Sequence, residues 1–188
     1  MADLDALIKD HLACVEALER ERDAIEAAAL ALAAVVQAGG RIFICGNGGS
    51  AADAQHFAAE VVGRFERERR ALPAVALTTD TSILTAVAND YGYDDIFVRQ
   101  LAGLAEKGDA LVGLSTSGNS RNVLAALRLA GKRGLTTVAL CGGDGGETGN
   151  VADYVILAPS ANTARIQEAH ILVLHFFAQI IENRNSDR

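Results

Sequence analysis

The chain has 188 residues, 50% of them hydrophobic, and can bury one substantial core, so we expect a single domain over residues 1–188, with a helical leader at 1–38 and an α/β core at 41–184. Its formal charge of −7 disfavours non-specific binding to nucleic acid. Because no apolar run reaches the length of a membrane span and no signal-peptide pattern opens the chain, we expect a cytoplasmic protein, with no nucleic acid and no membrane as partner.

The first 38 residues have the pattern of a helical leader. Apolar side chains recur at helical spacing over residues 3–38, with charges between them, until Gly39-Gly40 ends the pattern. The charged patch at residues 19–23 predicts a break or bend into two helices. We expect a leader of this length to cover a partner subunit as well as its own sheet. The alternative is a leader that packs only on its own domain.

The stretch Arg41-Ile-Phe-Ile-Cys-Gly-Asn-Gly-Gly-Ser50 is an apolar run that stops at glycines, and a helical pattern follows from Ala51 to Phe65. This order predicts a strand, a tight turn and a helix. Glycines let a backbone approach a ligand closely, and the free N–H groups at a helix start attract anions, so we expect a phosphate site here. The same helix carries His56 and Glu60 four residues apart, on one face.

The rest of the chain alternates apolar runs with helical patterns. Residues 66–70 form a charged run before Pro73, which predicts an exposed, solvated connection. Strands are expected at 74–77, 110–114, 136–140 and 154–157, and helices at 82–88, 95–105, 122–132 and 165–182. Continuous apolar strands between helices indicate a parallel sheet covered on both faces. We therefore expect an α/β fold, a three-layer α/β/α sandwich with a central five-stranded parallel sheet of the flavodoxin or Rossmann type.

The three cysteines, Cys14, Cys45 and Cys141, are odd in number and far apart, without a C-x-x-C pair. This spacing argues against a disulfide framework and against a thiolate zinc site. We expect all three to be small buried hydrophobic residues.

A second turn, Ser115-Thr-Ser-Gly-Asn-Ser120, follows a predicted strand just as the glycine turn does. Its hydroxyl groups are neutral donors, and Ser120 stands where an N-cap would open the next helix. Ligands of parallel sheets bind beyond the carboxyl ends of the strands, where the topology switches direction. If the two loops are neighbours there, one small phosphorylated molecule could touch both. The alternative is that the serines only cap and turn the chain.

The glycine turn also fits the relaxed dinucleotide fingerprint G-x-G-x-x-A, as Gly46-Asn-Gly-Gly-Ser-Ala51. That fingerprint needs an acidic residue about 20 positions on, and Asp80 lies somewhat far for that role. Dinucleotide binding would also leave the hydroxyl loop and the His56/Glu60 pair without a function. We therefore disfavour it.

Two polar side chains lie on nearly one face of the last helix. Gln167 and His175 are two turns apart, with apolar residues around them. Together with His56 and Glu60 they could hold one divalent cation, since imidazole and carboxylate suit zinc, although glutamine is an uncommon ligand. The alternatives are an ordinary helix-surface pair for His56 and Glu60 and core packing for His175.

Five motifs together resemble the phosphoheptose isomerase family, which has the sugar isomerase (SIS) fold, over essentially the whole chain. They are Gly46-Asn-Gly-Gly-Ser50, Gln55-His-Phe-Ala-Ala-Glu60, Asn89-Asp90-Tyr-Gly, Ser115-Thr-Ser-Gly-Asn-Ser120 and Arg165-Ile-Gln-Glu-Ala-His170. The resemblance implies conversion of sedoheptulose 7-phosphate to D-glycero-D-manno-heptose 7-phosphate, for the heptose of lipopolysaccharide. It also implies a homotetramer with sites between subunits, and zinc in at least some members.

Position by position, the resemblance implies that Glu60 is the base that moves a proton between C1 and C2 through an enediol, and that His175 is the acid/base on the oxygens. It assigns one zinc ion per subunit to His56, Glu60, Gln167 and His175. The substrate-binding positions that it implies are Asn47, Gly48, Gly49, Ser50, Glu60, Arg64, Asn89, Asp90, Ser115, Thr116, Ser117, Ser120 and Gln167.

An alternative function comes from a non-enzymatic adaptor of the same fold that binds the bacterial replication initiator. Residues 65–69, 72–74 and 164–168 also resemble that adaptor. The adaptor lacks counterparts of Glu60 and His175, and both are present here, which favours the enzyme. One departure from some isomerases is Ala164, where they carry an acidic residue.

Overall fold

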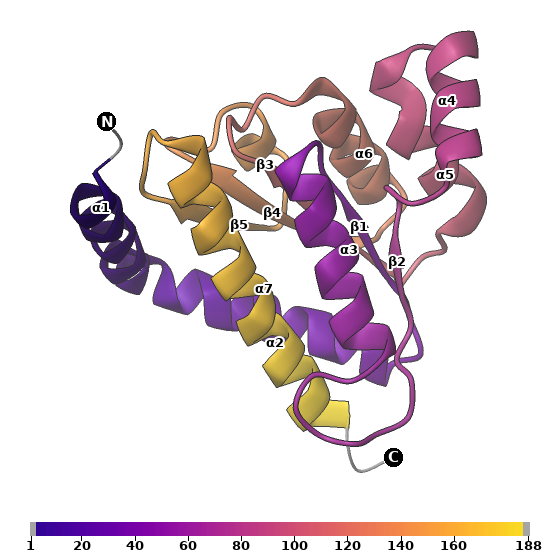
Figure 1. The fold of residues 1–188 in the computed structure, drawn as a ribbon. Helices are drawn as coiled ribbons and strands as arrows, with labels where there is room; N and C mark the ends of the chain where they lie inside the picture. Colours follow the sequence, from indigo (N-terminus) through magenta and orange to yellow (C-terminus); the bar gives the residue numbers. More distant parts are fainter. Residues whose placement is uncertain (1–2, 186–188) are drawn as a thin grey trace.

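Five apolar stretches form one parallel sheet at the centre of the protein (Figure 1), in a computed structural model that describes residues 3–185. The strands, in chain order, are β1 (Ile42–Cys45), β2 (Ala74–Ala76), β3 (Ala110–Ser115), β4 (Thr136–Gly142) and β5 (Tyr154–Ala158). Their order across the sheet is β2-β1-β3-β4-β5, and every neighbouring pair is parallel. The chain therefore reverses its direction of travel between β1 and β3, which creates a switch point there.

Helices cover both faces of the sheet, as the unbroken apolar strands predicted. One face is covered by α2 (Arg22–Gln37), α3 (Gly49–Val62) and α7 (Thr163–Asn185), and the other by α5 (Ile96–Leu104) and α6 (Arg121–Lys132), with α4 (Thr81–Asp90) packed beside α5. Side chains alternate along β1, so that Ile42 and Ile44 join the first core and Phe43 and Cys45 join the second. The three-layer α/β/α fold is confirmed, and all three cysteines are buried and free.

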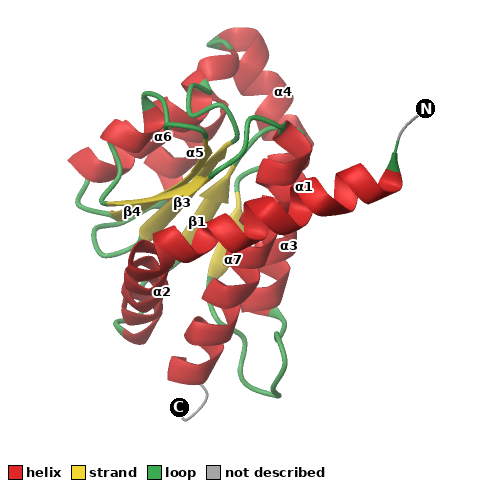
Figure 2. Ribbon diagram, turned by 90° about the vertical axis from the view of Figure 1, so that its left-hand side faces the viewer, coloured by secondary structure: helices red, strands yellow, loops and turns green. Residues whose placement is uncertain are grey.

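The N-terminal leader breaks where the charged patch predicted a break. Helix α1 (Leu4–Ala17) ends in a 3-10 turn, η1 (Leu18–Glu21), before α2 begins. Figure 2 shows α1 crossing α7 and projecting past the body of the molecule. A row of its apolar side chains is exposed, in fractions of 67, 44, 46 and 53% for Leu4, Leu7, Ile8 and Leu12.

Helix ends differ from the sequence expectation by a few residues, for local reasons. Helix α3 begins at Gly49 rather than Ala51, because Gly48 takes the N-cap position with φ +56°, and it ends at Val62, before Gly63. Helix α7 begins at Thr163 rather than 165, where the side chain of Asn162 accepts the N–H of Ala164 at 2.9 Å.

The charged connection after α3 was expected to be solvated, and this expectation is wrong at one residue. The side chain of Arg69 is only 1% exposed and lies 3.3 Å from the carboxylate of Glu182 on α7. A buried arginine needs a buried partner, and the sequence holds that partner more than a hundred positions away.

Candidate functional site

Two loops leave the sheet side by side, because β1 and β3 are neighbours: the glycine loop at 46–49 and the hydroxyl loop at 115–120. The side-chain amides of Asn47 and Asn122 join them, since each donates to the oxygen of the other, at 2.9 and 2.8 Å. The hydroxyl group of Tyr93 also donates to the Asn47 oxygen, at 3.0 Å. The expected proximity of the two loops is therefore confirmed.

The start of α3 has the properties of an anion site. Gly48 has a positive φ of +56°, which favours glycine. A Cβ built at this position would meet no atom within 4 Å, so the backbone there is open to a ligand. The N–H groups of Gly48 and Gly49 donate to no group within residues 3–185. Gly49 faces Gln167 of α7, since a Cβ on Gly49 would lie 2.5 Å from its Nε2 atom. The corner is therefore open, uncharged and bordered by a side-chain amide.

The hydroxyl loop supplies the second side of this corner. Ser115 donates its hydroxyl hydrogen to the oxygen of Ser120 at 3.0 Å and accepts the N–H of Ser120 at 3.3 Å. Ser120 occupies the N-cap position of α6, as expected, but its side chain makes no capping bond to that helix. Thr116 and Ser117 line a pocket of about 250 Å³ that extends to Thr163 at the start of α7.

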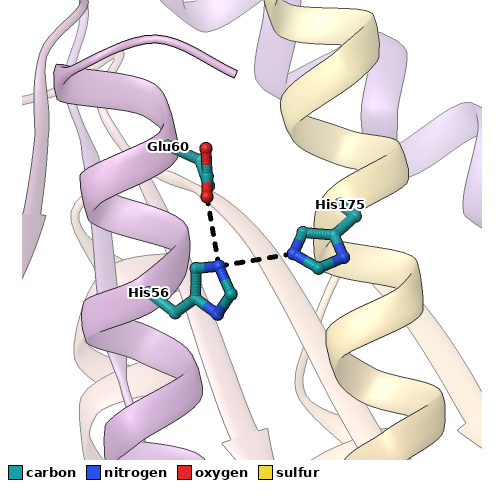
Figure 3. Close-up of side chains that lie close together, drawn as sticks. All are labelled: His56, Glu60 and His175. Carbon is teal, nitrogen blue, oxygen red and sulfur yellow. Dashed lines mark hydrogen bonds and ion pairs between the residues drawn. The ribbon is translucent and has the colours of Figure 1, made fainter. Parts of the chain in front are cut away.

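Farther along α3 and α7, three ionisable side chains converge (Figure 3). The Nε2 atom of His56 lies 3.1 Å from Oε1 of Glu60 and 3.4 Å from Nε2 of His175. Each residue offers one ligand atom, a nitrogen from each histidine and an oxygen from Glu60, and these three atoms lie within 4.8 Å of one another. The side chain of Glu60 is 23% exposed and that of His56 46%, so the cluster is open on one side.

These three side chains fit a divalent cation. The Nε2 atom of His56 contacts both other ligand atoms, and it cannot donate a hydrogen to Glu60 and also accept one from His175. Ligand atoms at zinc distances of about 2.0–2.1 Å in a tetrahedron stand about 3.3 Å apart, close to both observed separations. Two imidazoles and one carboxylate are also the donors of known zinc sites.

Two further residues of the cluster carried no signal in the sequence. The ring of Phe65 stacks on His175, with centroids 5.7 Å apart and planes 29° apart. Asp53 lies one turn before His56 on α3, and its Oδ2 atom is buried without a hydrogen-bond partner among the described residues. Burial raises the pKa of the Asp53 carboxyl group, and the nearby His56 acts in the opposite direction.

The structure does not bring every candidate residue to this cluster. Gln167 lies against Gly49, seven residues or about 10 Å before His56 on α3. Arg64 lies beyond the end of α3, 58% exposed and 4.0 Å from Glu68. Asn89 and Asp90 are exposed at the end of α4, where the amide of Asn89 donates to Asp90 at 2.8 Å.

Asn122 and Tyr93 are the functional candidates that sequence patterns missed. Their common partner, Asn47, lies 75 and 46 positions away, so no spacing rule connects them. The one available signal was a polar residue at a core position of a helix, because Asn122 is 2% exposed in the first turn of α6.

Comparisons with known proteins agree on one family. A model of the SIS domain family matches residues 8–142. A Geobacter sulfurreducens protein named phosphoheptose isomerase is 56% identical over 183 residues, which cover 97% of each chain. A protein of the same name from Aliarcobacter butzleri is 51% identical over 185 residues, 96% of this chain and 98% of the other.

Solved structures give the same result. The phosphoheptose isomerase of Neisseria gonorrhoeae superposes with a TM-score of 0.91 at 43% identity, covering 96% of this chain and 97% of its own. The one from Francisella tularensis gives a TM-score of 0.88 at 38% identity, covering 97% and 100%.

Proposed function

The chain belongs to the phosphoheptose isomerase family of SIS-domain proteins, and from this membership we propose that it converts sedoheptulose 7-phosphate to D-glycero-D-manno-heptose 7-phosphate. The reaction would supply the heptose of lipopolysaccharide. The observation that carries the proposal is the spacing of the site. An anion corner at the start of α3 and a proton-transfer cluster about 10 Å farther along suit a sugar whose reacting carbons lie far from its phosphate.

The phosphate end is bound by neutral donors in this proposal. The N–H groups of Gly48 and Gly49 and the positive end of the α3 dipole face the phosphate. The hydroxyl groups of the hydroxyl loop donate further hydrogen bonds to the phosphate. Because the formal charge of −7 gives an anionic substrate no long-range attraction, these local donors have to hold the phosphate. The proposed contacts at this end are Asn47, Gly48, Gly49, Ser50, Ser115, Thr116, Ser117, Ser120 and Gln167.

The reacting end requires two proton transfers. The Glu60 carboxylate takes the proton from C1, while His175 gives a proton to the oxygen on C2, and an enediol forms. Glu60 then returns its proton to C2, and His175 takes the proton from the oxygen on C1, which leaves an aldehyde there. Atoms and charges balance over the two steps. The Nε2 atoms of His56 and His175 lie 3.4 Å apart, so His56 stands directly beside the proposed acid/base.

We propose a zinc ion at this end, with His56, Glu60 and His175 as ligands and Gln167 as the fourth position implied by the family resemblance. When bound, it would supply, in place of the His175 proton, positive charge that stabilises the enediolate oxygens, because a nitrogen that ligates zinc cannot carry a proton. In the structure the Gln167 amide lies against Gly49, about 10 Å along α3 from His56, so its role as a zinc ligand rests on the family resemblance alone.

We also propose a cytoplasmic homotetramer. The exposed apolar row on α1 supports assembly, because a row of leucine and isoleucine side chains is costly to leave in water. Arg64, Asn89 and Asp90 lie away from the cluster in one chain, and we propose that they meet the substrate across a subunit boundary. No helix within residues 3–185 is long and apolar enough to cross a membrane.

The direct test is to incubate purified protein with sedoheptulose 7-phosphate and to follow the aldose phosphate by NMR. Turnover is expected, and its absence with and without added zinc would refute the isomerase. The adaptor alternative is disfavoured, because Glu60 and His175 are both present and the curated relatives described above are named as isomerases. The adaptor alternative predicts that the chain captures the replication initiator in a pull-down, and we expect no such capture.

A further inference from the structure

The connection after α3 is tied to the last helix by one buried carboxylate. Glu182 of α7 is 2% exposed, and its Oε1 atom accepts the N–H of Phe65 at 2.9 Å. Its Oε2 atom accepts the N–H groups of Glu66 at 3.0 Å and Arg67 at 2.9 Å. Burial acts to raise the pKa of Glu182, but these N–H donors and the charge of Arg69 outweigh burial, and the pKa is lowered. Glu182 is therefore held as a carboxylate.

The guanidinium group of Arg69 links this carboxylate to the end of α3. Its Nε atom lies 3.3 Å from Glu182, and the two side chains are 1% and 2% exposed. One terminal nitrogen donates to the backbone carbonyl oxygen of Glu60 at 2.8 Å, and the other to those of Gly63 and Arg70 at 3.2 and 3.0 Å. Arg69 thus holds the last turn of the helix that carries the proposed base.

The same connection holds the proposed acid/base through Phe65. The backbone of Phe65 is fixed by Glu182, and its ring stacks on His175 at 5.7 Å. Glu182 follows His175 on α7 by seven residues, so the two lie on one face of that helix. The Arg69–Glu182 ion pair therefore contacts both proposed proton-transfer residues indirectly. Arg69 binds the backbone carbonyl group of Glu60, and Glu182 fixes Phe65, whose ring stacks on His175.

We propose that Arg69 and Glu182 are positioning residues for proton transfer, which fix Phe65 on the His175 imidazole and hold the Glu60 end of α3. This inference rests on the proposed isomerase function. Neither residue touches the substrate in it. Because the phosphate corner lies at the other end of α3, loss of the ion pair should slow turnover and leave substrate binding intact.

The test compares Arg69→Gln with Arg70→Gln, which removes the same charge from the neighbouring exposed position. We expect Arg69→Gln to lower kcat about tenfold or more with KM within about twofold, and Arg70→Gln to change neither. A merely structural ion pair would instead lower the melting temperature and leave kcat of the folded fraction unchanged. That result would overturn the proposal.

A spectroscopic readout separates this inference from the isomerase itself. The chain has only four histidines, so the His175 ring signal can be assigned in NMR spectra of histidine-labelled protein by its loss in His175→Asn. In substrate-free protein, stacking on Phe65 should shift this signal, and Arg69→Gln but not Arg70→Gln should remove the shift. An unchanged His175 signal in folded Arg69→Gln would overturn the positioning role, whatever the wild-type protein turns over.

A second pair of variants keeps the ion pair and serves if Arg69→Gln fails to fold. Phe65→Leu removes the flat ring, and Phe65→Tyr retains it. We expect Phe65→Leu to lower kcat severalfold at nearly constant KM and Phe65→Tyr to restore most of the rate. Equal rates in both variants and in the wild-type protein would contradict the proposal.

Discussion

The two ends of the α3–α7 pair differ in the chemistry that they offer. At the start of α3 the groups are backbone N–H, hydroxyl and amide, all neutral, and the donors are fixed by loop geometry. In the second half of α3 the groups are two imidazoles and a carboxylate, placed by side chains from two helices. The first end is suited to holding an anion without titrating, and the second to moving protons. Substitutions at the first end should therefore mainly change KM, and substitutions at the second end should mainly change kcat.

The largest expected effect is at the proton-transfer end. Glu60→Gln keeps the shape of the side chain but removes its basicity, so we expect kcat to fall by about 10³-fold or more, with KM nearly unchanged. Initial rates on sedoheptulose 7-phosphate measure both constants. Glu106→Gln is the matched control, because Glu106 is 84% exposed and lies beside Arg41, in the loop that leads into β3. Substantial activity in Glu60→Gln would remove Glu60 as the base.

Zinc affinity tests the same end without turnover. We expect wild-type protein to bind one zinc ion per chain, and His56→Asn to weaken that binding by about 100-fold, because it removes the ligand atom between the other two. Isothermal titration calorimetry with zinc measures both the stoichiometry and the affinity. His11→Asn should bind zinc like the wild-type protein, because His11 pairs with Glu168, two turns before His175 on α7, and supplies none of the three converging ligand atoms. Equal affinity in His56→Asn would exclude the proposed metal site.

The sequence predicted the first end better than the second, for a physical reason. The glycine loop, its strand and its helix are contiguous, so local patterns were enough to place an anion site at Gly48 and Gly49. The order of strands then brought Ser115 beside it. At the second end, the His56/Glu60 pair also came from helical spacing.

At the second end, the contacts between side chains of different elements could not be predicted from the sequence. The stacking of Phe65 on His175 and the burial of Arg69 against Glu182 depend on how residues 63–70 pack on α7. No periodicity encodes that contact, and charge composition alone suggested a solvated loop. The family resemblance supplied the roles of Glu60 and His175, but it gave no account of the residues that hold them.

A smaller effect is expected where the two helices meet at the anion corner. Gly49→Ala would place a Cβ 2.5 Å from the Gln167 amide, which is the mobile end of a side chain and can move away. We expect KM to rise about tenfold with kcat changed less, because the corner is displaced while the distant cluster is not. Gly103→Ala is the matched control, since a Cβ there meets nothing within 4 Å. A fall in kcat alone would show that the two ends are not separable.

The smallest effect is expected from the bond between the two loops. Asn122→Ala removes both amide hydrogen bonds to Asn47, together worth about 1–3 kcal/mol, and leaves the Asn47 amide with Tyr93 as its remaining partner within the described residues. The loops should then separate slightly, so we expect KM to rise about threefold and the melting temperature to fall by several degrees. Asn150→Ala, which removes one exposed bond to Gly146, should leave KM unchanged. If Asn122→Ala lowered kcat instead, the loop junction would belong to the proton-transfer end, and the division between a neutral binding end and an ionisable reacting end would be wrong.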